Sequence, residues 1–259
     1  MGLDLEVGRV HTKRGIPVST AAIPVNVALV DDSHTIDASE LATVAGALNE
    51  QVQADFAPAW KVLGTVGAYP TAPPGTWAIH LQNGLDQAGA AGYHADDHHQ
   101  PYARVDLTAG DWTVTASHEL LEMLGDPWGN RLHTAASLKN WSGTSPRVSY
   151  LVELADPCEA FTYEAGGVKV SDFLVPAFYR SSPRAVAGYS HLGSLTEPLE
   201  VADGGYISFL DPGTGDLWQR FVQNGQTHDK NWGPQKLAAK SLREWADERA
   251  REFRSGLSG

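Results

Sequence analysis

One short segment of the chain contains three residues whose types and spacing suit metal-dependent hydrolysis. His118 and Glu122 are four residues apart in the segment Thr113–Leu124. On a helix, this spacing projects both side chains from the same face, one turn apart, so that both can bind one cation. Glu119 is displaced by about 100° around such a helix, and it can accept a proton from a water molecule beside the metal without being a ligand. The spacing predicts a metal-binding helix with an adjacent general base.

The same spacing has a simpler interpretation, a hydrogen-bonded pair between His118 and Glu122 on a surface helix. The residues around the pair argue against it. Four apolar side chains flank the polar ones and predict that most of the helix is buried, namely Leu120, Leu121, Met123 and Leu124. Because a buried carboxylate needs a hydrogen-bonding partner or a cation, this context favours the metal site.

Strand and helix signals precede the candidate helix. Val25–Val30 is a β-branched run that predicts a buried strand. Asp37 and Glu40 have the spacing of a capping box, at the start of a helix that is expected to continue to Phe56. A Gly- and His-rich loop is expected over residues 83–100. Three further strands and the candidate helix are expected at residues 61–69, 76–81, 102–107 and 111–124.

The second half of the chain is mainly β-structure in its sequence pattern. Residues 128–146 are rich in Gly, Ser, Asn and Thr and indicate a loop or small insertion. An amphipathic helix is expected over residues 234–253, with alternating charges opposite its apolar face. Strand signals lie between these segments, at residues 148–154, at 161–173 with a turn at Gly166-Gly167, and at 205–221 with a turn at residues 211–213. The expected fold class is therefore α+β.

Five segments of the chain together resemble the zincin metallopeptidases, as a group with HExxE in place of HExxH. They are GYH at 92–94, PYARV at 101–105, SHELLEMLGDP at 117–127, ELADP at 153–157 and VSDFLVP at 170–176. The resemblance covers most of residues 25–180 and implies a mixed sheet with a backing helix and an active-site helix. It also implies that strand 102–107 is the sheet edge along which an extended substrate lies. The expected parts are an N-terminal extension (1–20), a zincin-like catalytic domain (21–180), and a β-hairpin and C-terminal helix packed on it (181–259).

The resemblance assigns roles to the residues of the candidate helix. His118 and Glu122 match the two helical zinc ligands, and Glu119 matches the general base. The third ligand is left open. The spacing of the metzincins would require a ligand at Trp128, which excludes that arrangement. Gluzincins use a Glu far downstream of the helix, so Glu153 is the favoured third ligand.

Three other residues compete with Glu153 for this role. Asp156, in the same ELADP segment, is expected either to bind the metal or to accept a hydrogen bond that orients His118. Asp126 would coordinate only if the chain turned back directly after the helix, and a cap or loop anchor is the preferred interpretation. His133 is a remote candidate, in a loop without identified partners.

His94 is expected near the cleft, unlike the rest of the polar segment 94–99. Imidazoles and carboxylates are mixed in that segment, which is compatible with a second metal site, but a solvated loop is the favoured interpretation. Because His94 belongs to the GYH element, we expect it to bind substrate or to stabilise an oxyanion. Many zincins also use a phenol for the oxyanion, which four tyrosines could supply, namely Tyr150, Tyr163, Tyr179 and Tyr206.

Composition limits the partners and the metal ligands. The 259 residues include 19 Lys and Arg against 31 Asp and Glu, which gives a formal net charge of −12. Such a chain is not expected to bind nucleic acid or anionic membranes, because both require a cationic surface. Its single cysteine, Cys158, excludes a thiolate cluster, so a metal must be bound by His and carboxylates. No secretion signal is recognisable at the start of the chain, which predicts a cytoplasmic location.

The sequence therefore predicts a metal-dependent hydrolase, a metalloprotease or amidase, with zinc or another divalent metal as its cofactor. The peptide or amide substrate is expected in a cleft beside strand 102–107. Two alternatives remain open. One is a catalytically inactive zincin-like module that binds a metal or a partner. The other is an iron or manganese redox enzyme, since one His and two carboxylates also suit those metals.

Overall fold

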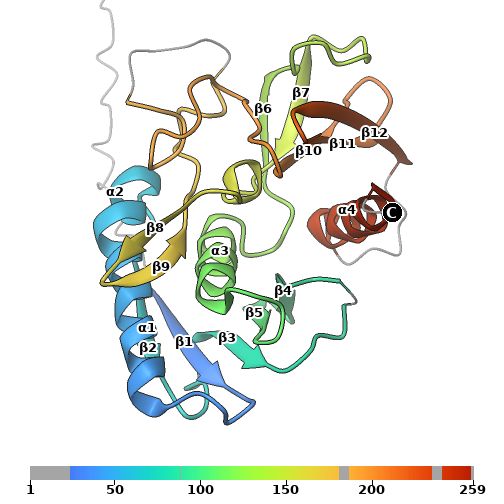
Figure 1. Cartoon of the computed structure of the whole chain (residues 1–259). Helices are drawn as coiled ribbons and strands as arrows, with labels where there is room; N and C mark the ends of the chain where they lie inside the picture. Colours follow the sequence, from blue (N-terminus) through green and yellow to red (C-terminus); the bar gives the residue numbers. More distant parts are fainter. Residues whose placement is uncertain (1–23, 88, 181–186, 235–240, 258–259) are drawn as a thin grey trace, which may run out of the picture.

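The computed structural model describes residues 24–87, 89–180, 187–234 and 241–257. The predicted N-terminal extension, residues 1–20, lies outside the described residues. In the described part of the chain, two five-stranded sheets and one two-stranded sheet are combined with a few helices, which confirms the α+β class. Figure 1 shows helix α3 (Trp112–Gly125) between the two larger sheets. The candidate metal-binding helix therefore lies at the centre of the fold.

The first sheet is formed by the first part of the chain, in the order β2-β1-β3-β5-β4. Strands β1, β2, β3 and β5 are parallel, and β4 is antiparallel to β5. One face of the sheet presents alternate apolar residues, which pack against both α1 and α3 in a single core. The strand bounds are β1 (Val25–Asp31), β2 (Gly64–Ala68), β3 (Trp77–Gln82), β4 (Gly92–Asp97) and β5 (Gln100–Asp106).

The predicted edge strand, residues 102–107, is not at the edge of the sheet. It corresponds to β5, which lies between β3 and β4, so β4 is the edge strand. The prediction was wrong because the polar composition of residues 83–100 indicates a loop, whereas a tight turn at His98 and His99 folds β4 back onto β5. Both histidines have positive φ angles, 50° and 64°, as in a type I′ hairpin turn. Their side chains are exposed, as the solvated interpretation predicts.

The helix after β1 begins where the sequence predicts but continues further. Helix α1 (Ala38–Glu50) is capped by Asp37, whose side chain accepts a hydrogen bond from the Ser39 N–H at 2.8 Å. The chain then continues through a π-helical turn, Gln51–Phe56, into the short helix α2, Ala57–Trp60. Because a π-helical turn shifts the side chains around the helix axis, it often marks a functional region.

The second sheet combines strands from both sides of the expected boundary at residue 180. Its order is β12-β11-β10-β7-β6, with antiparallel neighbours throughout. β6 lies within residues 128–146, where a loop or small insertion is expected, and β12 is an additional strand. The C-terminal strands therefore complete this sheet instead of only packing on the preceding part. The bounds are β6 (Leu132–Ala136), β7 (Arg147–Leu151), β10 (Tyr206–Leu210), β11 (Asp216–Gln223) and β12 (Gln226–Pro234).

A 3₁₀ turn, a β-hairpin and the C-terminal helix complete the surroundings of α3. The 3₁₀ turn η2 (Asp156–Cys158) follows β7. The predicted hairpin is present as β8 (Thr162–Ala165) and β9 (Val168–Ser171), and β9 lies against α3. Helix α4 (Leu242–Leu257) corresponds to the predicted C-terminal helix. Its predicted start is wrong at Pro234, which belongs to β12, and residues 235–240 lie outside the described residues.

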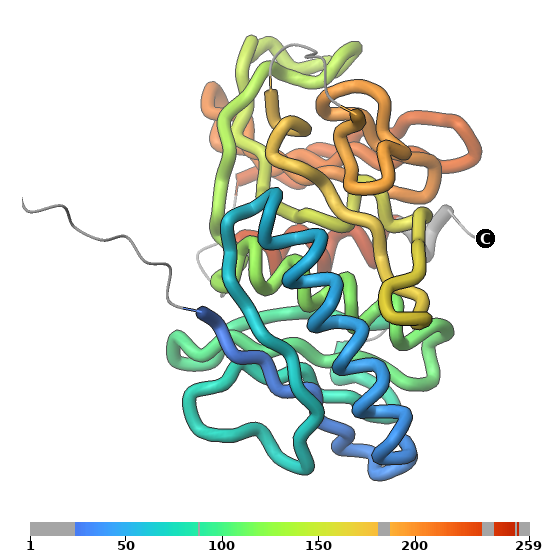
Figure 2. The backbone as a smooth tube through the Cα atoms, turned by 90° about the vertical axis from the view of Figure 1, so that its left-hand side faces the viewer, coloured from blue at the N-terminus to red at the C-terminus, as the bar shows by residue number. Residues whose placement is uncertain are grey.

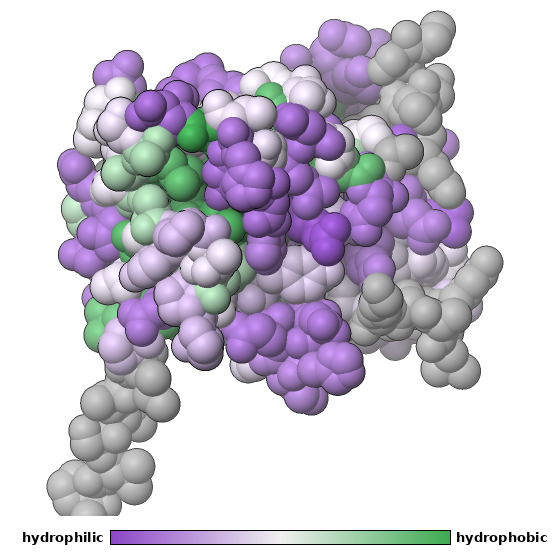
Figure 3. Space-filling view, turned by 90° about the horizontal axis from the view of Figure 1, so that it is seen from below, coloured by the Kyte–Doolittle hydropathy of each residue, from purple (hydrophilic) through white to green (hydrophobic). Residues whose placement is uncertain are grey.

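The first and second sheets share one core around α3. Figure 2 shows α1 and the first sheet in the lower part of the molecule, the later strands in the upper part, and α4 (red) between them. The face seen from below in Figure 3 is mostly hydrophilic, with hydrophobic residues gathered in a smaller area. Within the described part of the chain, none of the helices has the length and apolar composition needed to cross a membrane.

Candidate metal centre

Helix α3 is held in one orientation by its buried faces. Ser117 Oγ donates a hydrogen bond to Gln51 Oε1 at 2.7 Å and accepts one from the Ser171 N–H at 3.0 Å. Gln51, the first residue of the π-helical turn, also donates to the Ser171 carbonyl at 3.0 Å. These bonds fix the residue directly before His118. The apolar side chains of the helix are fully buried in the main core, namely Leu120, Leu121 and Met123.

His118, Glu122 and Asp156 lie together between α3 and η2. His118 Nε2 is 3.0 Å from Asp156 Oδ1 and 3.4 Å from Glu122 Oε1. One ligand atom from each of the three residues lies within 4.8 Å of the others. Glu122 Oε1 also accepts hydrogen bonds from the N–H groups of Ala155 and Asp156, at 3.1 and 3.3 Å. The carboxylate on the helix therefore positions the downstream carboxylate next to His118.

Glu153, the favoured third ligand, does not join this group. Asp156 is the downstream carboxylate beside His118, and Glu153 forms a neighbouring group with Asp156 and Asp247. The physical reason is the course of the backbone. Strand β7 ends at Leu151, and Glu153 lies in the connection that follows, whereas Asp156 is the first residue of the 3₁₀ turn η2, which directs its side chain towards α3. Spacing alone does not distinguish the two carboxylates of the ELADP segment.

The two weaker candidates for the third ligand lie elsewhere. The Asp126 carboxylate accepts hydrogen bonds from the N–H groups of Asn130 and Arg131, at 3.2 and 2.7 Å. Asp126 therefore anchors the loop after α3, in agreement with the preferred interpretation. His133 is exposed on β6 and lies next to the Tyr179 ring, and it belongs to none of the ligand groups found in the described residues.

The electrostatics of the centre shift the pKa values of His118 and Glu119. Burial alone would lower the pKa of His118, but the neighbouring carboxylates outweigh this effect and hold the pKa well above its usual range. Burial raises the pKa of Glu119 from 4.5 to about 7, against the opposing effects of His118 and Arg243. A carboxyl group that titrates near pH 7 is suited to proton transfer at neutral pH.

Glu119 and His118 line a cavity of about 310 Å³. The start of the edge strand β4 forms one wall, and a Cβ on Gly92 would lie 3.0 Å from Glu119 Cγ. Glu119 therefore lies between the edge strand and the cavity. The other polar residues that line the cavity include Asp156, Tyr206, Arg243 and Asp247.

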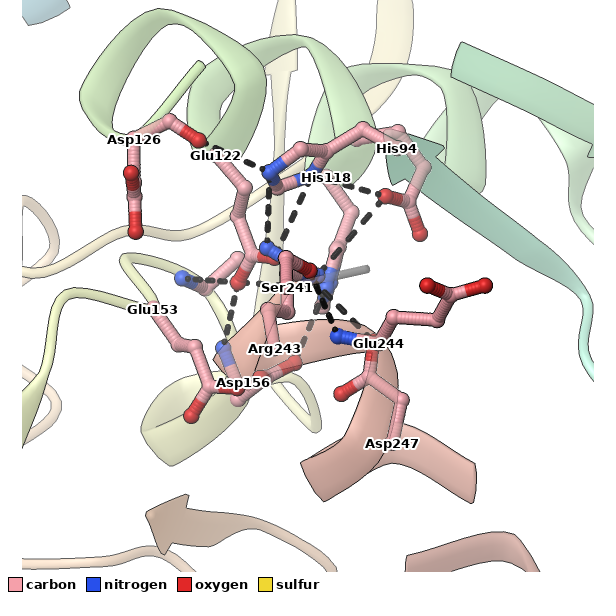
Figure 4. Close-up of polar contacts among 12 residues, drawn as sticks. His94, His118, Glu122, Asp126, Glu153, Asp156, Ser241, Arg243, Glu244 and Asp247 are labelled. Atoms are coloured by element: carbon pink, nitrogen blue, oxygen red, sulfur yellow. Dashed lines mark hydrogen bonds and ion pairs between the residues drawn. The ribbon is translucent and has the colours of Figure 1, made fainter. Parts of the chain in front are cut away.

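Arg243 is a residue of the centre that the sequence pattern does not reveal. The charged face of the C-terminal helix is expected to face solvent, yet Arg243 is only 3% exposed. Its Nη2 atom contacts Glu122 Oε2 and lies 3.8 Å from Glu119 Oε2, and its Nε atom lies 3.2 Å from Asp247 Oδ2 (Figure 4). The spacing of Arg243 and Asp247 is a weak signal, because such pairs are common on exposed helices. A guanidinium thus neutralises part of the buried acidic cluster.

His94 is buried beneath the cavity and faces Glu119. Its Nε2 atom lies 3.1 Å from Arg243 Nη1 and 3.1 Å from the Asp126 carbonyl oxygen (Figure 4). These two contacts place opposite demands on Nε2, because it accepts from the guanidinium only when unprotonated and donates to the carbonyl only when protonated. The other ring nitrogen, Nδ1, lies 3.4 Å from Glu119 Oε2. Burial, assisted by Arg243, lowers the pKa of His94 to about 4, which agrees with a neutral ring.

The predicted contact between His94 and substrate is not supported by this geometry. The His94 side chain has no exposed surface, so a molecule in the cavity does not reach it in this conformation. The ring lies beside Glu119, on the strand that packs directly against α3. Its position suits a residue that orients the Glu119 carboxylate.

One of the four candidate tyrosines lies at the centre. Tyr206 lines the cavity, and its hydroxyl donates a hydrogen bond to Asp247 Oδ1 at 3.2 Å. The other three donate to groups outside the His118 site, namely Tyr150 to the Ala136 carbonyl, Tyr163 to Asp55 and Tyr179 to the Glu153 carbonyl. Tyr206 is therefore the tyrosine best placed to contact a bound molecule.

The buried His, Glu and Asp groups could hold a divalent metal ion. Their ligand atoms are nitrogen and oxygen, which suit zinc as well as harder metals. In the described part of the chain, Asp156 Oδ2 is buried without a hydrogen-bond partner, and such an atom calls for a cation or a proton. Comparison of the chain with protein-family models, with curated proteins and with solved structures gave no match in any of the three, so the function rests on the geometry of this site.

Proposed function

We propose that the protein is a metal-dependent hydrolase of peptide or amide bonds, with a zincin-like arrangement in which HExxE replaces HExxH. One observation supports this proposal above the others. His118, Glu122 and Asp156 offer ligand atoms within 4.8 Å of one another, and Glu119 lines the same cavity as His118 and Asp156. Two helical ligands, a downstream carboxylate and a nearby base are the parts that this class of hydrolysis needs.

The donor set fits a divalent cation. One imidazole and two carboxylates would hold zinc, and they favour a harder metal more than an all-histidine set does. The buried Asp156 Oδ2 atom has no hydrogen-bond partner in the described part of the chain, and coordination to a metal ion would satisfy it. A bound divalent metal lowers the pKa of water and polarises a carbonyl group.

The residues around the cavity would move and hold the reacting protons. Glu119 would accept a proton from water on its carboxylate and then donate it to the leaving amine, and in the metal-free chain burial holds its pKa at about 7. The buried His94 ring, whose Nδ1 lies 3.4 Å from Glu119 Oε2, would restrict the movement of that carboxylate. The start of strand β4 borders the cavity, so an extended substrate would lie along β4 instead of along residues 102–107.

A second candidate function follows from Arg243. Its guanidinium contacts Glu122 Oε2, so the chain supplies a cation of its own to one of the proposed ligands. If this ion pair takes the place of a metal, the protein is a catalytically inactive relative whose cleft binds a partner. The two candidates differ in metal content, because a permanent Arg243–Glu122 pair requires no metal.

A Glu119→Gln variant tests the proposed hydrolase. The amide keeps the shape of the side chain but cannot accept the proton, so the rate on a peptide library should fall by about 10²–10⁴-fold while metal binding is retained. Glu164→Gln, at an exposed position of β8, is the matched control and should leave the rate unchanged. Equal rates for Glu119→Gln and the unmodified protein would exclude Glu119 as the base.

A further inference from the structure

Glu153 is a buried acidic residue that the proposed reaction does not use. It is 1% exposed, and within the described residues neither of its carboxylate oxygens has a hydrogen-bond partner. An ionised carboxylate in such a position is strongly destabilising unless a cation or a proton satisfies it. In the folded protein, Glu153 therefore needs either a bound cation or a proton.

The Glu153 carboxylate faces two other acidic side chains. Glu153, Asp156 and Asp247 each offer an oxygen within 4.8 Å of the other two. Figure 4 shows Glu153 and Asp156 side by side, with Asp247 on α4 across from them. Asp156 also belongs to the His118 group, so it is common to both groups. Its Oδ2 atom is likewise buried without a hydrogen bond in the described part of the chain.

The charges of the cluster leave room for more than one cation. Five buried or nearly buried carboxylates meet there, while Arg243 contributes one positive charge, and its contacts are with Glu122, Glu119 and Asp247 rather than Glu153. The five are Glu119, Glu122, Glu153, Asp156 and Asp247. One divalent ion at His118 would leave Glu153 itself without a direct counter-charge.

We propose that Glu153, Asp156 and Asp247 form a second divalent cation site, which shares Asp156 with the site at His118. This inference rests on the proposed metal site at His118 and extends it to a two-metal centre. Shared carboxylates are typical of two-metal hydrolases, whose ions lie about 3.5–4 Å apart. Because all three ligands are carboxylates, the second site prefers a hard cation such as Mn²⁺.

Titration of the chelator-treated full chain with Mn²⁺, followed by electron paramagnetic resonance, tests the second site. The unmodified protein should bind two Mn²⁺ ions with a spin-coupled spectrum, because the shared carboxylate links them. Glu153→Gln should bind one ion with an uncoupled spectrum. Glu164→Gln, exposed on β8, should behave as the unmodified protein. Asp247→Asn is a second test of the same site, should Glu153→Gln fail to fold.

The outcomes separate this inference from the proposed function. One uncoupled Mn²⁺ ion that Glu153→Gln retains and His118→Gln loses would overturn the second site and leave the His118 site standing. One ion that Glu153→Gln loses and His118→Gln retains would overturn the His118 site and, with it, the shared centre. Two uncoupled ions would contradict the sharing of Asp156, and no bound Mn²⁺ would contradict the second site.

Discussion

The guanidinium of Arg243 contacts the carboxylate of Glu122, which is also part of the His118 group. The positive charge of a C-terminal helix side chain is therefore paired with the negative charge of a candidate metal ligand on the central helix. Removing one partner of a buried ion pair leaves an uncompensated charge and costs about 3–5 kcal/mol. Arg243 thus stabilises the cluster when no metal is bound, and a metal at Glu122 would reduce that dependence.

Replacement of Arg243 should destabilise the metal-free protein far more than the metal-loaded protein. Arg243→Gln leaves Glu122 and Glu119 without their guanidinium, so we expect a loss of about 3–5 kcal/mol in chelator and a smaller loss with saturating Zn²⁺. Urea unfolding in both conditions measures the difference. Arg147→Gln, which removes an exposed arginine, is the control. An equal loss in both conditions would mean that Arg243 and a metal do not share Glu122.

The contact between the edge strand and α3 should be sensitive to one added methyl group. A Cβ at Gly92 would lie 2.6 Å from Thr115 Cγ2 and 3.0 Å from Glu119 Cγ, so Gly92→Ala must displace one of these side chains. We expect a destabilisation of about 1–3 kcal/mol, together with a loss of any activity that depends on Glu119.

Gly46→Ala is the matched control for this substitution. Gly46 lies in α1, and a Cβ there meets nothing within 4 Å, so alanine should stabilise the helix by about 0.5–1 kcal/mol. Thermal unfolding of both variants measures the two effects. Unchanged stability and activity in Gly92→Ala would contradict the close packing of β4 on Glu119.

The buried His94 should make the metal-free protein less stable in acid. Its pKa is about 4 in the folded chain against 6.5 when unperturbed, so the unfolded chain binds the proton more tightly. This contribution to stability is therefore complete above pH 6.5 and is lost as the pH falls from 6.5 towards 4, by about 1.4 kcal/mol per pH unit at most. His94→Gln lacks it.

The free energies of unfolding of the unmodified protein and of His94→Gln, measured in chelator between pH 7 and pH 4.5, check this prediction. The unmodified protein should lose its advantage over the variant as the pH is lowered. A constant difference across the range would show that His94 is not held neutral in the folded chain.

Local pattern and spacing predict the parts of the centre that lie on one helix. The four-residue spacing of His118 and Glu122, with Glu119 beside them, depends only on helical geometry, and the apolar residues between them indicate burial. The capping residue Asp37 and the turn at Gly166-Gly167 are likewise local signals that the structure bears out. These predictions need no knowledge of distant contacts.

Tertiary packing decides the parts that the sequence pattern does not predict. β4 is polar in sequence, and it becomes an edge strand because the turn at His98 and His99 pairs it with β5. The choice of Asp156 over Glu153 beside His118 depends on the η2 turn and on its hydrogen bonds to Glu122. Arg243 enters the cluster only because α4 packs over the second sheet, a contact between distant parts of the chain.

The metal content of the protein, purified without added metal or chelator, shows whether the His118 group holds a divalent cation. Elemental analysis should find at least one equivalent of a divalent metal per chain in the unmodified protein. His118→Gln should contain one equivalent less, and Asp156→Asn, which alters the ligand shared by both proposed sites, should lose at least as much, while their circular dichroism remains that of a folded protein. A folded unmodified protein that contains no divalent metal and binds none on addition of Zn²⁺ or Mn²⁺ would show that the His118 group is not a metal site.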